Sequence, residues 1–481
     1  MINSQLKIYN TLSKKKENFK PLNGNLVTMY ACGITPQSPS HVGHIVAALR
    51  FAAIRRYLEF VGYKVAYVEN ITDIDDKIIA KSKEQGRSVT VIAEENYNEY
   101  RGLLNYLGVP SPSYTPKVSE YIDKIINYVQ DLIDSGYAYT ANNGDVYFDI
   151  SKKADYYKLS GRNIDDNLSA TRVKEEINKR SYEDFALWKV DQNDLNGQFS
   201  WLTPWKNEQG HQVYGRPGWH IECSVMANDL LGSTIDIHCG GLDLLFPHHE
   251  NEIVQCEAHN NCEFARFWAH CGLLNIDGVK MSKSLNNFIT AKEACARYGK
   301  DLLIWTTLKH NYRSSIDIND RLYLDSLNQI LNFYSNFESV KLIGVDALCE
   351  DLDIEILNDF VQAMDNDFQT QEVIVNFAKI LFSNDTNPKK IKTVYCLGKT
   401  LGLFNSKAFS EVQNDLLSFF NSATGNSLSV LKINNIINEI INLRANKNYI
   451  DSDKLRDQLL SQGIKLKYVG GVISWEFDLS S

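Results

Sequence analysis

The sequence of 481 residues contains no run of about 18 apolar residues, the length that a membrane-spanning helix needs. Its first residues also lack the charged-then-apolar layout of a secretion signal, so we expect a cytoplasmic protein without membrane contact. Hydrophobic residues make up 44% and charged residues 23%, as in an ordinary globular protein. At this length we expect two to four domains and at least one large core.

Cysteine pairs with C-x-x-C spacing are also missing, and the number of cysteines, nine, is odd. Both facts argue against a disulfide framework and suit a reducing compartment. We expect six of the cysteines to serve only in packing: Cys256, Cys262, Cys271, Cys295, Cys349 and Cys396.

An excess of basic residues is absent too, because the net charge is −9. This is only a weak argument against a nucleic-acid partner, since phosphate binding needs a local basic surface and not a net positive charge on the whole protein. A candidate surface lies near the C-terminus and contains Arg444, Lys447, Lys454, Arg456, Lys465 and Lys467. On charge alone, a solvated helix face explains these residues equally well.

The first hundred residues contain a β-α-β pattern. In order, we expect a strand, a loop rich in glycine and proline, a long helix and a second strand, at residues 26–32, 33–40, 41–62 and 64–68. Ser40 is the expected N-cap of the helix. Such units build parallel sheets that bind ligands at the carboxyl ends of the strands, which is where Cys32 and His41 would lie.

Beyond this unit the pattern predicts an α/β fold with an insertion. Residues of about 113–213 combine charged helices with a strand near 145–150, and the sheet resumes near 236–238 and 267–270. From about residue 322 the pattern is helical, and a strand pair over 464–477 ends the chain.

Four residues of mixed chemistry form a candidate metal site: Cys32, Cys223, His248 and Glu252. The last two are spaced i, i+4, so on a helix both side chains leave one face. Zinc accepts this mixture of sulfur, nitrogen and oxygen ligands. Taken alone, Cys223 is more often a buried core cysteine than a ligand.

The sequence around His248 differs from the H-E-x-x-H motif of zinc proteases. That motif needs a second histidine four residues after the first, and this position holds Glu252 after His248 and Ile253 after His249. A hydrolytic zinc enzyme is therefore disfavoured. His249 and Glu250 would instead orient the metal ligands.

Two short segments suit polyphosphate. His41-Val42-Gly43-His44 opens a helix, where free N–H groups attract phosphate and imidazoles can stabilise charge on phosphorus. Lys280-Met281-Ser282-Lys283-Ser284 carries two ammonium groups on a loop. Each segment alone also fits a purely structural role, but finding both in this order within an α/β pattern makes coincidence improbable.

In these segments and in others along the chain, the sequence resembles the cysteinyl-tRNA synthetases, a class I aminoacyl-tRNA synthetase family. The resemblance extends nearly from end to end. Several of the shared strings are specific to the cysteine enzymes: Asn70-Ile71-Thr72-Asp73-Ile74-Asp75-Asp76-Lys77, Gly215-Arg216-Pro217-Gly218-Trp219-His220, Phe246-Pro247-His248-His249-Glu250-Asn251-Glu252 and Ser452-Asp453-Lys454-Leu455-Arg456-Asp457.

The resemblance implies a domain order. A Rossmann-type parallel-sheet catalytic domain would span residues 1–320, with a connective insertion over 113–213 and a lysine loop at 280–284. A helical tRNA-binding domain would follow over 321–430, and a small α/β anticodon-binding region over 431–481.

The resemblance also implies an activity: ATP-dependent attachment of L-cysteine to tRNA(Cys) through cysteinyl-adenylate, in a protein that works as a monomer. The substrate thiolate would bind one Zn²⁺ held by Cys32, Cys223, His248 and Glu252. The residues lining the amino-acid pocket would be Thr72, Trp219 and His238. ATP, taken with Mg²⁺, would contact Gly43, Asp243 and Lys283, and the catalytic side chains would be His41, His44, Lys280 and Lys283.

The chain departs from the family pattern at Gln37-Ser38, Cys239, Asn286 and Ile304, all on the expected nucleotide side. Two alternatives therefore stay open. One is a ligase that joins cysteine to a small amine, which the C-terminal region disfavours because such ligases lack it. The other is a catalytically silent paralogue that binds RNA or zinc.

Overall fold

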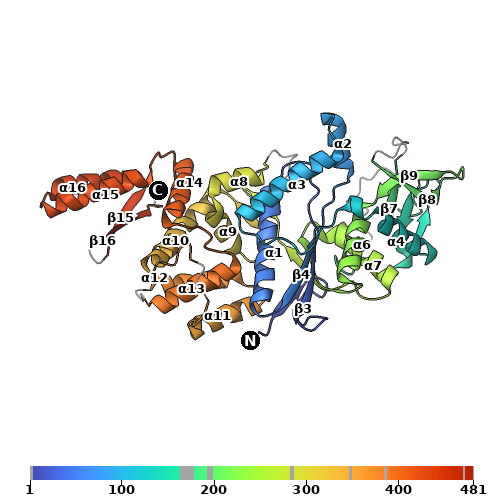
Figure 1. The fold of residues 1–481 in the computed structure, drawn as a ribbon, viewed down its shortest axis with the longest axis horizontal. Coiled ribbons are helices and arrows are strands. Elements are labelled where there is room, and N and C mark those ends of the chain that lie inside the picture. Colours follow the sequence, from blue (N-terminus) through green and yellow to red (C-terminus); the bar gives the residue numbers. More distant parts are fainter. Residues whose placement is uncertain are drawn as a thin grey trace. The chain divides into compact units, whose positions relative to one another are not determined.

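The computed structural model describes residues 4–162, 178–191, 199–281, 287–345, 349–383, 387–469 and 472–479 (Figure 1). The chain forms two units. The first comprises Met1–Ser40, Leu58–Gly102 and Pro110–Leu273, and the second comprises His41–Tyr57, Leu103–Val109 and Leu274–Ser481. Each unit is therefore assembled from three separate stretches of chain.

A four-stranded parallel sheet organises the first unit. Its strands lie in the order β11 (Ala265–Cys271), β10 (Ile235–Gly241), β3 (Leu26–Ala31) and β4 (Lys64–Glu69). Strands β3 and β10 are buried along almost their whole length, as expected for parallel strands covered on both faces. The predicted α/β fold class with a parallel sheet is thus confirmed, and the carboxyl ends of the strands share one edge.

The predicted insertion contains a second sheet, which is antiparallel. Its order is β5 (Ala138–Thr140), β6 (Val146–Phe148), β7 (Phe185–Val190), β9 (Gln212–Pro217) and β8 (Trp201–Lys206). Helix α4 (Ile122–Asp134) lies with these strands in Figure 1, and its residues Ile125, Val129 and Leu132 share a buried cluster with Phe148 and Trp188. Because β9 leads directly into α6 (Trp219–Leu231), the insertion fixes where that helix begins.

The remaining elements of the first unit are short strands and helices around the two sheets. They are β1 (Lys7–Asn10), β2 (Lys15–Asn18), α2 (Asp76–Gln85), α3 (Val89–Tyr106, whose last turn belongs to the second unit), η1 (Val118–Glu120), η2 (Ile150–Lys152), η3 (Leu245–His249) and α7 (Glu250–Asn260).

The second unit is mainly helical. Besides most of α1 (Val42–Phe60) and a small sheet of β12 (Leu274–Ile276), β13 (Val279–Lys280) and β14 (Ile316–Ile318), it holds α8 (Ala291–Tyr298), α9 (Lys300–Leu308), α10 (Asp320–Ser339), α11 (Ile354–Asp365), α12 (Thr370–Phe382), α13 (Pro388–Leu401) and α14 (Phe409–Thr424). The stripe of α10 that includes Leu327, Ile330 and Phe337 is buried, as its three- and four-residue spacing predicts.

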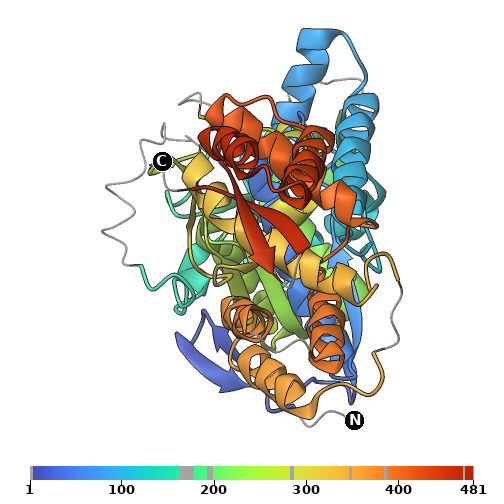
Figure 2. The same cartoon turned by 90° about the vertical axis from the view of Figure 1, so that its left-hand side faces the viewer.

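The C-terminal part consists of α15 (Val430–Ala445), α16 (Tyr449–Ser461) and the strand pair β15 (Ile464–Val469) and β16 (Val472–Phe477), which Figure 2 shows together. The side chain of Asn328 on α10 donates to the carbonyl of Phe477 at 2.8 Å and accepts from its N–H at 2.8 Å. The strand pair is thereby tied to α10. The predicted domain boundaries near residues 320 and 430 stay predictions.

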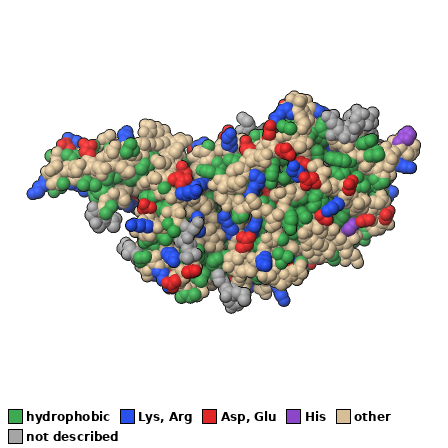
Figure 3. All heavy atoms as spheres, in the orientation of Figure 1, with side chains coloured by type: hydrophobic (Ala, Val, Ile, Leu, Met, Phe, Trp, Pro, Cys, Tyr) green, Lys and Arg blue, Asp and Glu red, His purple; other side chains and the backbone are tan. Residues whose placement is uncertain are grey.

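The expectation that six cysteines serve only in packing was wrong in part. Cys262 and Cys349 are exposed, whereas the other four cysteines assigned to packing are buried. In the basic C-terminal stretch, five of the six cations pair with acidic groups of the same segment: Arg444, Lys454, Arg456, Lys465 and Lys467. Figure 3 likewise shows cations and anions interspersed over the visible face. Among the described residues, no helix is long and apolar enough to span a membrane.

Candidate functional site

The four predicted metal ligands come together in the first unit. Cys32 directly follows β3, Cys223 lies in the second turn of α6, His248 lies in η3 and Glu252 in the first turn of α7. Their ligand atoms all lie within 4.8 Å of one another. Cys223, His248 and Glu252 are buried, and Cys32 is partly exposed. The cluster therefore has the composition and compactness of a metal site.

The loops at the sheet edge fix the two thiols. The backbone N–H of Gly33 donates to the side-chain oxygen of Asn70 at 2.8 Å, and the same oxygen lies 3.7 Å from the sulfur of Cys223. A Cβ atom at position 33 would lie 1.7 Å from the Asn70 carbonyl oxygen, so only glycine fits there. The segment after β4 is thereby held against the residue that follows Cys32.

Glu252 lies at the centre of the cluster. Its Oε1 is 2.9 Å from Nε2 of His248 and 3.4 Å from the sulfur of Cys32, and its Oε2 is 2.8 Å from Nε2 of His238. Burial alone would raise the pKa of Glu252, but the charges of His238 and His248 hold it well below its usual range. Glu252 is therefore a carboxylate near neutral pH.

The two thiols differ in acidity. A hydrogen bond from Cys32 lowers the pKa of Cys223 to about 6 despite burial, whereas burial raises the pKa of Cys32 well above its usual value. Burial also opposes the charged form of His248, yet the neighbouring Glu252 raises the pKa of that imidazole to about 10. Cys223 and Glu252 are therefore the two anionic donors of the cluster near neutral pH.

His248 provides the clearest sign of a missing partner. Its Nδ1 lies 2.8 Å from Nδ1 of His220, but its Nε2 has no aligned hydrogen-bond partner among the described residues, although Glu252 is close. Native proteins rarely leave a buried polar nitrogen unsatisfied. The donor set and this nitrogen both fit a bound divalent cation.

A second group of donors overlaps the first: Cys32, His238, His249 and Glu252. His249 lies 3.5 Å from the sulfur of Cys32 through its Nε2, and its Nδ1 is 2.8 Å from Nε2 of His270. His249 is thus placed to orient a ligand, as predicted. The prediction for Glu250 was wrong, because its carboxylate accepts from the backbone N–H groups of Leu159 and Ser160 at 3.0 and 2.8 Å.

Two of the three residues predicted to line the amino-acid pocket, Trp219 and His238, contact the cluster. The ring of Trp219, which is 44% exposed, lies 4.3 Å from that of His248 between centroids. Thr72 is buried and donates to Glu222 at 3.0 Å. His238 has no exposed surface; its Nε2 lies 2.8 Å from Oε2 of Glu252, and its ring stacks on that of Trp268 with centroids 4.5 Å apart.

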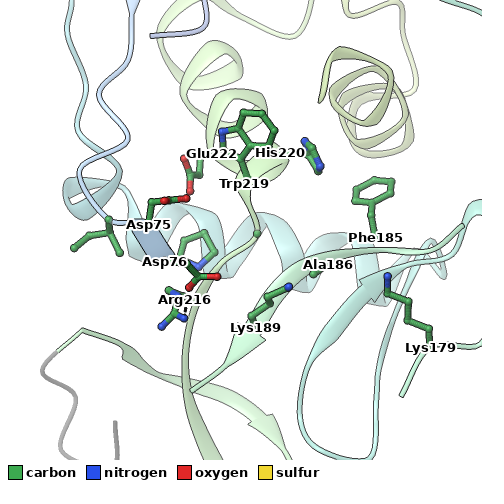
Figure 4. Close-up of a pocket in the computed structure, with 13 residues that line it drawn as sticks. Asp75, Asp76, Lys179, Phe185, Ala186, Lys189, Arg216, Trp219, His220 and Glu222 are labelled. Atoms are coloured by element: carbon green, nitrogen blue, oxygen red, sulfur yellow. Dashed lines mark hydrogen bonds and ion pairs between the residues drawn. The ribbon is translucent and has the colours of Figure 1, made fainter. Parts of the chain in front are cut away.

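Sequence reasoning missed His220 and Glu222, which Figure 4 shows beside Trp219. Burial lowers the pKa of His220 well below its usual value and raises that of Glu222 well above it, so both are poised to be neutral. Both residues lie in the first turn of α6, close to Cys223 in sequence. This closeness to a candidate metal ligand was the signal that could have indicated a role for them.

The predicted phosphate-binding histidines lie at the start of α1 in the second unit. Nδ1 of His44 accepts from the backbone N–H of His41 at 3.2 Å, and the two rings stack with centroids 3.7 Å apart. The hydroxyl of Ser40 has no hydrogen-bond partner among the described residues, so the predicted N-cap role was wrong. At this end of the helix, the ring of His44 accepts from the backbone N–H of His41 instead.

Gly43 has a steric role in this turn, because a Cβ atom there would lie 2.8 Å from Nδ1 of His41.

The other residues predicted to bind ATP lie in separate segments. Lys280 ends strand β13, and Lys283 lies outside the described residues. Asp243, in the first unit, is exposed in the turn after β10.

None of the departures from the family pattern is itself a donor of the cluster, although the carbonyl of Cys239 accepts from the N–H of Cys32 at 3.4 Å. Side chains alternate along a strand, so Cys239 points away from the face that carries His238. Ile304 is buried within α9, the N–H of Gln37 donates to the Thr35 carbonyl at 2.8 Å, and Asn286 is not among the described residues.

Comparison with known proteins decides the family. Residues 18–328 match the family described as tRNA synthetases class I (C) catalytic domain. The Cysteine--tRNA ligase of Hahella chejuensis is 37% identical over 480 residues, 98% of this chain and 99% of that protein. The chain belongs to the cysteine--tRNA ligase family. The ligases of Marinomonas sp. and Francisella tularensis subsp. novicida are also 37% identical, over 96% and 97% of this chain and 97% and 99% of their own.

Solved structures agree on the fold. Methionyl-tRNA synthetase of Mycobacterium tuberculosis in complex with methionyl-adenylate has a TM-score of 0.55 at 12% identity, covering 81% of this chain and 93% of that chain. The LeuRS–tRNA–LeuAMS complex of Agrobacterium radiobacter has a TM-score of 0.56 at 10% identity, covering 83% and 86%. At such low identity these similarities show the fold of this chain and nothing more.

Proposed function

We propose that this protein attaches L-cysteine to tRNA(Cys) with ATP, through cysteinyl-adenylate, as a cytoplasmic monomer. Family membership supports the reaction class, and the cluster of Cys32, Cys223, His248 and Glu252 is the observation that carries the choice of amino acid. The predicted regions 321–430 and 431–481 would contact the tRNA.

Zn²⁺ fits the cluster, because two thiols, an imidazole and a carboxylate converge and Nε2 of His248 lacks an aligned partner. Of the two overlapping donor groups, the one with both thiols is preferred, since it offers two sulfur ligands to zinc where the other offers one. Bound there, zinc would hold the substrate thiolate. A thiolate–zinc bond separates cysteine from serine, whereas differences in burial give only about 1–3 kcal/mol.

The surrounding residues would position this chemistry. His238 orients Glu252, and His220 orients His248. Trp219 and Thr72 would line the space for the amino acid. No protein nucleophile is required, so positioning and electrostatics would supply most of the rate.

On the nucleotide side, His41 and His44 would stabilise the reacting phosphorus of ATP. Because Nδ1 of His44 accepts a backbone hydrogen bond, the proton of the neutral ring sits on Nε2, where it can be donated to a phosphate oxygen. Gly43 would admit the nucleotide, Asp243 would contact the ribose, and Lys280 and Lys283 would hold the phosphates with Mg²⁺.

Metal analysis and cysteine-dependent ATP–pyrophosphate exchange on one preparation test the proposal. We expect zinc in the protein and exchange that requires cysteine. Exchange without charging of tRNA(Cys) would instead support a small-amine ligase. A zinc-loaded protein without exchange would support a silent RNA-binding paralogue, and active protein free of metal would contradict the proposed site.

A further inference from the structure

Tyr30 is a buried residue of β3 on the face of the parallel sheet that carries the metal cluster. Side chains alternate along a strand, so Tyr30 and Cys32 point to the same face. Across the strands Tyr30 pairs with His238 of β10, and the two ring centroids lie 5.3 Å apart. Tyr30 also shares a buried hydrophobic cluster with Cys223 of α6. The phenol therefore lies among the residues that bring the metal ligands together.

The hydroxyl of Tyr30 has no aligned hydrogen-bond partner among the described residues, and the side chain has no exposed surface. The sulfur of Cys223 is close to this hydroxyl, and Cys32 and Glu252 are near enough to affect its acidity. A buried hydroxyl without a partner costs free energy, so native proteins rarely contain one. Tyr30 therefore holds a donor beside the cluster that an acceptor among the ligands would satisfy.

Cys223 is the ligand that most needs this donor once a metal is bound. The sulfur of Cys32 already contacts Glu252 and His249. Cys223 lies 3.7 Å from the side-chain oxygen of Asn70, to which a thiol can donate but a thiolate cannot. Cysteines bind metals as thiolates, so a metal-bound Cys32 also loses the proton that it now donates to Cys223. The hydroxyl of Tyr30 can take the place of that donor.

We propose that Tyr30 is a positioning residue of the metal site, whose hydroxyl donates a hydrogen bond to the sulfur of Cys223 when zinc is bound. This inference rests on the proposed function and deepens it. The hydrogen bond would hold the sulfur in place and stabilise its negative charge in a buried setting. Tyr30 would thus strengthen the hold on the ion that selects the amino acid, without touching the substrate itself.

The variant Y30F tests the assignment, because it removes the hydroxyl and leaves the ring. We expect the Kd for Zn²⁺, measured by competition with a chelator, to rise about tenfold. In protein loaded with Co²⁺ instead of zinc, the charge-transfer band from sulfur to metal should move to longer wavelength. The reason is that a thiolate without the hydrogen bond gives up its electrons more readily.

Y128F is the matched control. Tyr128 of α4 is also buried, and its hydroxyl likewise has no aligned partner among the described residues. This hydroxyl lies close to Cys256, which belongs to neither donor group. The zinc affinity and the cobalt spectrum of Y128F should therefore equal those of the unmodified protein.

Stability measurements separate this hydrogen bond from a packing role. Without metal, Y30F loses only a donor that has no aligned partner, so the urea midpoint of the chelator-treated protein should not fall. Added zinc should raise the midpoint of Y30F less than that of the unmodified protein. A lower midpoint in metal-free Y30F, an unchanged zinc affinity, an unshifted cobalt band or an equal loss in Y128F would overturn the inference alone. Unmodified protein that binds no zinc would overturn the proposed metal site as well.

Discussion

At the scale of single residues, Glu252 shows how a buried carboxylate stays ionised. Its two oxygens contact His248 and Cys32 on one side and His238 on the other. A buried carboxylate without such partners would take up a proton. A hydrogen bond from Cys32 lowers the pKa of Cys223 to about 6, so the cluster has anionic donors before a cation arrives.

Replacing Cys223 with serine tests the ligand assignment. Serine has a poorly acidic hydroxyl, so C223S should lose most of its zinc and raise the KM for cysteine by at least about 100-fold, while the KM for ATP changes less than about threefold. Metal analysis and exchange kinetics measure these effects. C256S, a buried cysteine of α7 outside both donor groups, is the control. Comparable losses for cysteine and ATP would contradict the assignment.

At the scale of elements, a few buried polar groups connect segments far apart in sequence. Glu250 at the start of α7 is completely buried and accepts from the N–H groups of Leu159 and Ser160. Asp301 in α9 accepts from the hydroxyl of Tyr334 at 2.7 Å, from the N–H of Asn405 at 3.1 Å and from the hydroxyl of Ser406. In both places one carboxylate satisfies several donors that would otherwise be buried alone.

Removal of the Glu250 carboxylate should loosen the end of the insertion. E250A leaves two buried N–H groups unpaired, at a cost of about 2–4 kcal/mol, and hydrogen exchange at Leu159 and Ser160 should accelerate accordingly. E263Q, which removes a charge from the exposed pair with Arg266, should change stability by less than about 1 kcal/mol. Unchanged protection of the two amides in E250A would refute the role.

Asp301 should make stability depend on pH. Burial raises its pKa, so the folded protein holds this proton more tightly than the unfolded chain. The contribution of Asp301 to the free energy of unfolding is therefore complete below about 3.9, the ordinary pKa of aspartate. It falls as the pH rises from that value through the raised pKa. The difference in urea midpoint between the unmodified protein and D301N should decrease over that window and then level off. A difference that stays constant with pH would show that Asp301 does not titrate there.

At the scale of the whole molecule, the helical part and the C-terminal strand pair are joined by a small contact. Asn328 makes two hydrogen bonds of 2.8 Å to the backbone of Phe477, and the rings of Phe420 and Phe477 lie 4.8 Å apart. If the strand pair helps to bind tRNA, its attachment should matter for charging and not for adenylate formation.

N328A tests that division. We expect the KM for tRNA(Cys) to rise by up to about 30-fold, because two hydrogen bonds of roughly 1 kcal/mol each are lost, while exchange stays normal. N332A, one turn along α10 and bonded only locally to Asn336, should have little effect. An equal loss of exchange and charging in N328A would show that the substitution disturbs the fold more widely.

Much of the fold and of the site could be predicted because the signals are local or repeated. The β-α-β pattern places Cys32 at a sheet edge, and the i, i+4 spacing brings His248 toward Glu252. The partners of Glu250 and the contact of His220 with His248 could not be predicted, because they join segments whose distance depends on tertiary packing. The cap of α1 was missed because the ring of His44, not the hydroxyl of Ser40, accepts a backbone hydrogen bond at the start of this helix.

The metal cluster joins parts of the chain that lie far apart in sequence. Cys32 and Glu252 meet across 220 positions of sequence. A cation joining them would act as a covalent-like cross-link that closes a very long loop, and such links remove the most freedom from an unfolded polypeptide. During synthesis the ring cannot close until residue 252 has left the ribosome, so the metal could be captured only after about half of the 481 residues have been made.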